Sequence, residues 1–89
     1  MSIVDIFILA TMSSENKLPL SKIVEKIQVA ELRRVPSRLA IYKRLQVLKE
    51  HECVITFWGE RGEKLYTISQ IGKSEIREFK NQLTRAESA

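Results

Sequence analysis

The basic side chains of this 89-residue sequence are concentrated in one short segment. Six basic residues and no acidic one lie between Leu32 and Lys49: Arg33, Arg34, Arg38, Lys43, Arg44 and Lys49. The remainder holds nine basic and eleven acidic residues, so the net charge of +4 comes entirely from this segment. Cations gathered on one element neutralise phosphates and release counterions, which is typical of a nucleic-acid binder. A solvated helix face is the alternative, and the abundance of acids elsewhere favours nucleic acid.

Residues suited to catalysis or metal binding are sparse. His51 and Cys53 are the only histidine and cysteine, whereas a structural zinc site needs four ligands, so a metal would have to be shared between two chains. We find neither a nucleophile with a base and an orienting group nor a Gly-rich phosphate loop. The sequence therefore predicts a non-enzyme without cofactor or metal. The lone cysteine excludes an internal disulfide framework and leaves an intersubunit disulfide open.

Length and composition indicate one small domain over 1–89. An apolar fraction of 44% is sufficient for a core, and 29% charged residues are ordinary for a soluble protein. The apolar run Ile3–Met12 is too short to cross a bilayer, contains Asp5 and lacks the basic leader of a secretion signal. We expect a soluble, cytoplasmic protein with no membrane partner.

The basic segment is predicted to be a connector leading into a helix over 37–51. Val35 should be extended because proline disfavours the helical region for its predecessor, and Ser37 is suited to cap the helix. The buried stripe recurs at i, i+4 and i+7: Ile41, Leu45 and Leu48. The opposite face carries Leu39, Lys43, Gln46 and Glu50, flanked by Tyr42. Arg44 lies near the edge of the stripe, where pairing with a carboxylate of the same domain is expected.

Two helices are predicted before this segment. The first spans 3–14, with Ser2 as N-cap and Asp5 at N3. Its apolar residues occupy nearly the whole circumference, and such a helix must be covered on more than one side. In a chain this small, we expect a second subunit to supply that cover. The second helix is predicted to open at Pro19 with Ser21 as N-cap, and one face buries Ile23, Val24 and Ile27.

After Cys53, β-branched and aromatic residues predict a hairpin with strands 54–58 and 64–68 around a Gly-bounded loop. Ser69 is suited to cap a final helix over 70–85, whose apolar stripe is Ile71, Ile76, Phe79 and Leu83. The first and last helices supply the predicted dimer interface: Ile3, Phe7, Ile76, Phe79 and Leu83. Phe57 and Trp58 belong to the hairpin, and we expect at least one of them in the core; a stacking platform for single-stranded bases is the alternative.

The order helix, helix, helix, hairpin, helix is a mainly α architecture with a small β-hairpin (α+β), and it resembles the winged helix-turn-helix fold. Ile41-Tyr42-Lys43-Arg44-Leu45-Gln46-Val47-Leu48-Lys49-Glu50 is similar to the recognition helix of PadR-like transcriptional regulators, within the MarR-like group. Leu65-Tyr66-Thr67-Ile68-Ser69-Gln70-Ile71-Gly72-Lys73 is similar to their strand-to-helix pattern. Two positions depart: Leu39-Ala40 stands where the family usually has Gly-Thr, and Glu52 where it has Gly.

The resemblance implies a symmetric dimer on duplex DNA, with the helix over 37–51 in the major groove and the wing over 54–68 along the backbone. The predicted DNA-binding residues are Arg33, Arg34, Ser37, Arg38, Leu39, Tyr42, Lys43, Gln46, Arg61 and Lys64. Arg38 suits guanine, Gln46 adenine and Leu39 a thymine methyl. Ser37 is a helix cap with or without a DNA contact, and Tyr42 either binds phosphate or is half-buried.

At the hairpin tip, Arg61 and Lys64 reach flanking phosphates or the minor groove, or else Arg61 is a solvated turn residue beside Glu60 and Glu63. The sequence thus favours a homodimeric regulator of transcription that binds double-stranded DNA sequence-specifically. Two alternatives are a winged-helix protein–protein interaction module without DNA binding, and a single-stranded nucleic-acid binder that uses Trp58 and Phe57.

Overall fold

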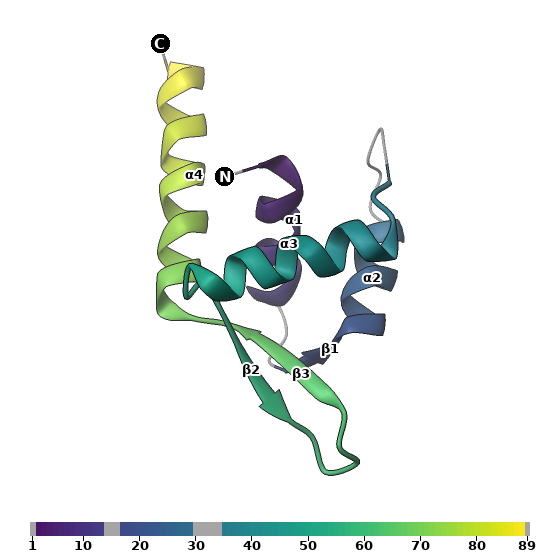
Figure 1. Cartoon of the computed structure of the whole chain (residues 1–89). Helices are drawn as coiled ribbons and strands as arrows, with labels where there is room; N and C mark the ends of the chain where they lie inside the picture. The colour runs from purple at the N-terminus through teal and green to yellow at the C-terminus, as the bar shows by residue number, and fades with distance from the viewer. Residues whose placement is uncertain (1, 14–16, 30–34, 89) are drawn as a thin grey trace.

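The computed structural model describes residues 2–13, 17–29 and 35–88. Its elements are α1 (Ile3–Ser13), β1 (Leu18–Pro19), α2 (Leu20–Val29), α3 (Arg38–Glu50), β2 (Val54–Trp58), β3 (Lys64–Ile68) and α4 (Gln70–Ser88). In Figure 1, α3 crosses in front of α1, α2 and α4 stand on either side, and the β2–β3 hairpin projects below. This arrangement is the predicted α+β winged helix-turn-helix, and it leaves one long side of α3 facing outward.

Helix α1 begins at the predicted cap. The Asp5 N–H donates to Ser2 Oγ and the Ser2 N–H donates to Asp5 Oδ2, both at 3.2 Å, which forms a reciprocal capping box. The helix packs against α2, α3, α4 and β3, and Ile8, Leu9 and Met12 are fully buried. One side of the helix is therefore covered by the same chain, while Ile3 is exposed and Ile6 and Phe7 are half-buried. The cover that the sequence assigned to a second subunit stays a prediction for this remaining surface.

Helix α2 begins at Leu20, so Ser21 lies inside its first turn and is not the N-cap that the sequence suggested. The preceding residues form the short strand β1, in which Leu18 pairs with Tyr66 and Pro19 with Leu65. Two residues are too few to show the alternation of a strand, so this element was not predicted. The pairing of β1 with β3 sets the direction in which the chain enters α2, and α2 begins directly after Pro19. The predicted buried face of α2 is confirmed: Ile23, Val24 and Ile27.

Both ends of α3 are closed by hydrogen bonds. Ser37 Oγ accepts the Ala40 N–H at 3.1 Å, as the sequence predicted. At the other end, the Cys53 N–H donates to the Leu48 carbonyl at 2.9 Å and the Glu52 N–H to the Lys49 carbonyl at 3.0 Å. These two bonds form a Schellman motif, which requires a left-handed residue. Glu52 adopts that conformation, with φ of 62°.

Strands β2 and β3 have the predicted bounds and form the wing. The sheet order is β1-β3-β2, and the hairpin register runs from Val54 opposite Ile68 to Trp58 opposite Lys64. The tip turns through Gly62, whose φ of 78° favours glycine. The expectation that Phe57 or Trp58 lies in the core was wrong, because both side chains are exposed. Tyr66 of β3 is the buried aromatic instead.

Helix α4 is capped by Ser69, whose Oγ accepts the Gly72 N–H at 3.1 Å, as predicted. Gly72 is needed here because a Cβ would lie only 2.4 Å from the Cys53 carbonyl oxygen. The helix continues to Ser88, beyond the predicted end at 85. Within the described ranges, no helix combines the length and apolarity needed to span a membrane.

Candidate nucleic-acid interface

The outward side of α3 presents the predicted base-contacting residues. Ile41, Leu45 and Leu48 are buried and fix the rotation of the helix about its axis. As a result, the side chains away from this stripe are exposed: Arg38, Leu39, Tyr42 and Lys43. All four lie in the first half of the helix, which is the part of a recognition helix that usually contacts base edges. Ser37 serves as the cap, and Arg33 and Arg34 lie outside the described residues.

Gln46 does not share this exposure. The side chain is half-buried, and its Nε2 is enclosed without a hydrogen-bond partner in the part of the chain that is described. In this conformation Gln46 does not expose both the oxygen and the NH2 group of its side-chain amide, which adenine recognition needs. The helical period puts Gln46 well away from the buried stripe, so its burial could not be anticipated from periodicity. Gln46 is therefore only a peripheral member of the predicted DNA-binding residues.

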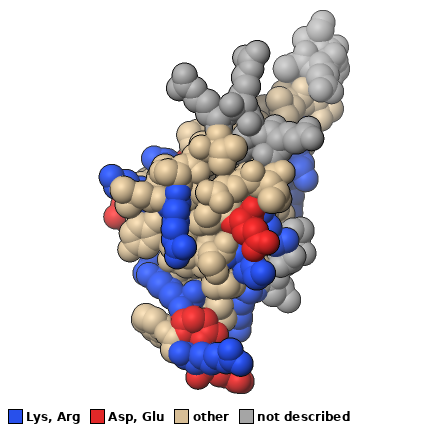
Figure 2. Space-filling model, turned by 90° about the vertical axis from the view of Figure 1, so that its right-hand side faces the viewer, with Lys and Arg blue, Asp and Glu red and all other residues tan. Residues whose placement is uncertain are grey.

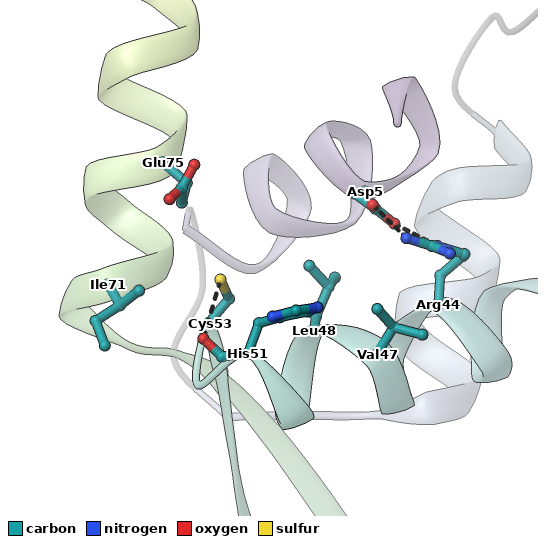
Figure 3. Close-up of a pocket in the computed structure, with 8 residues that line it drawn as sticks. All are labelled: Asp5, Arg44, Val47, Leu48, His51, Cys53, Ile71 and Glu75. Atoms are coloured by element: carbon teal, nitrogen blue, oxygen red, sulfur yellow. Dashed lines mark hydrogen bonds and ion pairs between the residues drawn. The ribbon is translucent and has the colours of Figure 1, made fainter. Parts of the chain in front are cut away.

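Arg44 faces inward and pairs with Asp5 of α1, as the sequence suggested. Its Nε and Nη2 donate to Asp5 Oδ1 and Oδ2, each at 2.7 Å, in a bidentate ion pair (Figure 3). Burial alone would raise the pKa of Asp5, but the hydrogen bonds from Arg44 and Ser2 outweigh it and lower the pKa below the usual value. The positive charge of Arg44 is thus compensated within the chain. The exposed cations that α3 contributes are Arg38, Lys43 and Lys49.

A pocket of about 410 Å³ lies beside this ion pair, where α1, α3 and α4 meet. Figure 3 shows its lining residues: Asp5, Arg44, Val47, Leu48, His51, Cys53, Ile71 and Glu75. Burial raises the pKa of the Cys53 thiol, and the nearby carboxylates of Glu75 and Asp5 raise it further. The thiolate is therefore disfavoured, and this buried cysteine is a packing residue with low reactivity.

The tip of the wing carries equal numbers of acidic and basic residues: Glu60, Arg61, Glu63 and Lys64. Figure 2 shows red and blue side chains close together at the lower end of the molecule, where Figure 1 places the wing tip. Glu63 Oε2 accepts the Arg61 N–H at 3.0 Å, so this carboxylate helps to hold the turn. Arg61 itself is exposed, whereas Lys64 is half-buried with its Nζ 5.6 Å from the centre of the Tyr66 ring.

The core-facing side of the wing adjoins α3. Burial raises the pKa of Tyr66, and Tyr42 of α3 adds a smaller electrostatic contribution in the same direction. Tyr42 belongs to α3 and Tyr66 to the hairpin. Helix α3 also contacts β2, so the helix and the wing are neighbours in the fold.

The predicted dimer-interface residues have different environments. Ile76 is only 7% exposed and packs into the core of its own chain, so little of its side chain is available to a second subunit. Ile3 and Leu83 are exposed, and Phe7 and Phe79 are half-buried. These four residues leave apolar surface on α1 and α4 open to solvent.

No protein-family model and no curated protein matches the sequence. Its structure is similar to that of a PadR family transcription regulator from hypervirulent Clostridium difficile, with a TM-score of 0.80, 16% identity, and 98% of this chain and 93% of that chain covered. A MarR family transcriptional regulator from Silicibacter pomeroyi gives a TM-score of 0.77 at 13% identity, with 98% of this chain and 55% of that chain covered.

Bacillus subtilis PadR, solved in complex with operator DNA, gives a TM-score of 0.74 at 19% identity, with 89% of this chain and 46% of that chain covered. The chain thus spans nearly the whole length of the Clostridium difficile protein and about half of each of the other two. These likenesses confirm the predicted resemblance to PadR-like and MarR-like winged-helix regulators at the level of the fold.

Proposed function

We propose that this chain is a regulator of transcription that binds double-stranded DNA in a sequence-specific manner as a homodimer. The helix over 37–51 lies in the major groove, and the wing over 54–68 follows the flanking backbone. The observation that carries this proposal is the outward side of α3, where Arg38, Leu39, Tyr42 and Lys43 are exposed together on a firmly packed helix. The operator complex of Bacillus subtilis PadR, a protein of similar fold, supports it.

Each exposed side chain of α3 has a distinct role in this proposal. Arg38, in the first turn, donates two hydrogen bonds to guanine O6 and N7, and Leu39 contacts a thymine methyl. Lys43 and the Tyr42 hydroxyl bind phosphates, since most protein–DNA hydrogen bonds go to the backbone. Arg33 and Arg34 precede the helix and add phosphate contacts by their charge. Arg44 is left out, because Asp5 already neutralises it.

The homodimer rests on the exposed apolar residues of α1 and α4. Ile3 and Leu83 are exposed and Phe7 and Phe79 are half-buried, so association removes their apolar surface from water. A two-fold axis between the subunits presents two α3 helices to major grooves about one helical turn apart, on a pseudo-palindromic site. The similar proteins are transcription regulators, which supports a non-enzymatic role for this chain.

The decisive experiment is selection of bound sequences from a random duplex library, followed by fluorescence anisotropy at several salt concentrations. We expect an enriched, pseudo-palindromic motif. The log–log salt slope should be about −4 or steeper, because each phosphate contact contributes about 0.9. Absence of duplex binding at low salt would refute the proposal and favour the protein–protein module, and preference for a single strand would favour the single-stranded alternative.

The oligomeric state is tested separately by sedimentation at micromolar concentration. The wild-type chain should sediment as a dimer, and Leu83→Lys should shift it toward monomer, because a charge would be buried in the apolar contact. Gln82→Lys is the matched control, since it adds the same charge at the adjacent exposed position of α4. A wild-type monomer, or equal effects of the two variants, would contradict the proposed interface.

A further inference from the structure

Trp58, at the outer end of β2, has the largest exposed fraction of any large apolar side chain among the described residues, at 77%. Aromatic rings of this size usually contribute much of a small protein's buried apolar surface. Phe57, the neighbouring aromatic, is 38% exposed and has the Lys17 Nζ 4.6 Å from the centre of its ring. The indole of Trp58 thus remains mostly in solvent, although the adjacent ring is partly covered.

The hairpin register places Trp58 on the side of the wing that continues toward α3. Directly opposed residues of an antiparallel pair share a face, and side chains alternate along each strand. Trp58 is opposite Lys64, Thr56 is opposite Tyr66, and the innermost pair on this face is buried. Val54 and Ile68 of this pair lie in the core and α3 contacts β2, so this face of the wing runs from the packed body of the chain to the tip.

The charge of the wing tip gives little reason for attraction to phosphate. Its two acidic and two basic residues cancel, and the Lys64 ammonium lies over the Tyr66 ring. A contact between this tip and a duplex must therefore draw mainly on apolar and stacking interactions. Such contacts are made in the minor groove by rings that pack against sugars or enter between base steps.

We propose that Trp58 is a DNA-contacting residue of the wing, whose indole packs in the minor groove beside the bases contacted by α3. This inference rests on the proposed function and adds a contact that the predicted residue set omitted. It assigns the wing an apolar contribution to affinity. Because the indole contact releases no counterions, it contributes affinity without contributing to the salt slope.

Trp58 is the only tryptophan of the chain, so its fluorescence reports on this contact directly. The full chain is titrated with a duplex of about 30 base pairs, long enough for two half-sites one turn apart. Binding is followed at once by anisotropy of a dye on the DNA and by tryptophan emission. We expect the emission to be quenched or shifted in parallel with the anisotropy, and to a smaller extent with the single strand alone.

Trp58→Ala should weaken duplex binding about tenfold with an unchanged salt slope, whereas Trp58→Phe should recover part of the loss. Ile55→Ala is the matched control, because Ile55 lies on the same strand, is 45% exposed and occupies the opposite face by alternation. Circular dichroism of each variant checks that the hairpin is intact.

Three results would overturn the inference. Duplex binding seen by anisotropy with unchanged emission and full affinity of Trp58→Ala would remove Trp58 from the interface while leaving the proposed function intact. Stronger quenching by the single strand than by the duplex would make Trp58 a platform for unpaired bases. Absence of any duplex binding by the wild-type chain would refute both the proposed function and this inference.

Discussion

Arg44 of α3 holds Asp5 of α1 through two hydrogen bonds of 2.7 Å, and this pair joins α3 to the first helix of the chain. Asp5 is buried and also accepts the Ser2 N–H that caps α1, whereas the Arg44 side chain remains 39% exposed. The Asp5 carboxylate therefore takes part in the N-terminal cap of α1 and also helps to orient α3 through Arg44. The sequence suggested that Arg44 pairs with a carboxylate of the same domain, and the structure identifies that carboxylate as Asp5.

Asp5→Asn should destabilise the fold, because it removes a negative charge from two guanidinium hydrogen bonds. We expect a loss of about 1–3 kcal/mol in the free energy of unfolding, less than for a fully buried pair because Arg44 is partly solvated. Urea denaturation measures this loss. Lys22→Ala is the control, since it breaks the exposed Lys22–Glu25 pair and should cost less than about 0.5 kcal/mol. Equal losses would contradict a special role for Asp5.

The Asp5 pair also predicts the direction of acid sensitivity. The pKa of Asp5 is lower in the folded chain than its usual value, so the folded state favours the ionised carboxylate. Its stabilisation is complete above the unfolded pKa, about 4, and is lost as pH falls through the folded pKa. The stability difference between wild type and Asp5→Asn should therefore be constant near neutrality and shrink below about pH 4. A difference that grows on acidification would refute this sign.

Arg38→Ala tests the base contact at the start of α3. If Arg38 forms a bidentate pair with guanine, the variant should lose about 1–3 kcal/mol of duplex affinity and tolerate other bases at one position of each half-site. Anisotropy with a set of singly substituted duplexes measures both effects. Lys73→Ala removes an exposed positive charge from α4 and serves as the control. Unchanged affinity of Arg38→Ala would remove this residue from the base-contacting surface.

Glu52→Gly should stabilise the chain. Glu52 has φ of 62°, and a left-handed conformation costs an ordinary L-residue about 1–2 kcal/mol, which glycine avoids. Glycine also has more conformational freedom in the unfolded state, which offsets part of this gain. We therefore expect the free energy of unfolding, measured by thermal or urea denaturation, to rise by about 0.5–1 kcal/mol. Glu52→Ala keeps the backbone strain and should show no gain. A destabilised Glu52→Gly variant would mean that the glutamate side chain contributes more than the strain costs.

The elements with strong local patterns were predictable from the sequence. The stripe Ile41, Leu45 and Leu48, with Ser37 before it, defined α3, and alternating β-branched and aromatic residues defined both strands of the wing. The departure at Glu52 from the glycine of PadR-like proteins also marked a position that is left-handed in the structure. Caps and periodicity act over a few residues, so a single sequence contains them.

Features that depend on the packing of distant elements were not predictable. Strand β1 exists because Leu18 and Pro19 pair with β3, and Gln46 is half-buried although its helical position points away from the stripe. The circumference of α1 did not reveal that α2, α3, α4 and β3 of the same chain cover one side of the helix. Composition also placed an aromatic of β2 in the core, and only the three-dimensional packing assigns that place to Tyr66.

Ser69 connects three neighbouring segments of the chain through its hydrogen bonds. Its Oγ donates to the Glu52 carbonyl, its N–H donates to the Cys53 carbonyl at 3.0 Å, and its Oγ accepts the Gly72 N–H. The segment that follows α3, the start of the wing and the first turn of α4 are therefore joined through the hydrogen bonds of Ser69. A swing of α4 would therefore tilt α3 and the wing together. In the proposed homodimer, the angle at which the two subunits associate would set the distance between the two DNA segments that they bind.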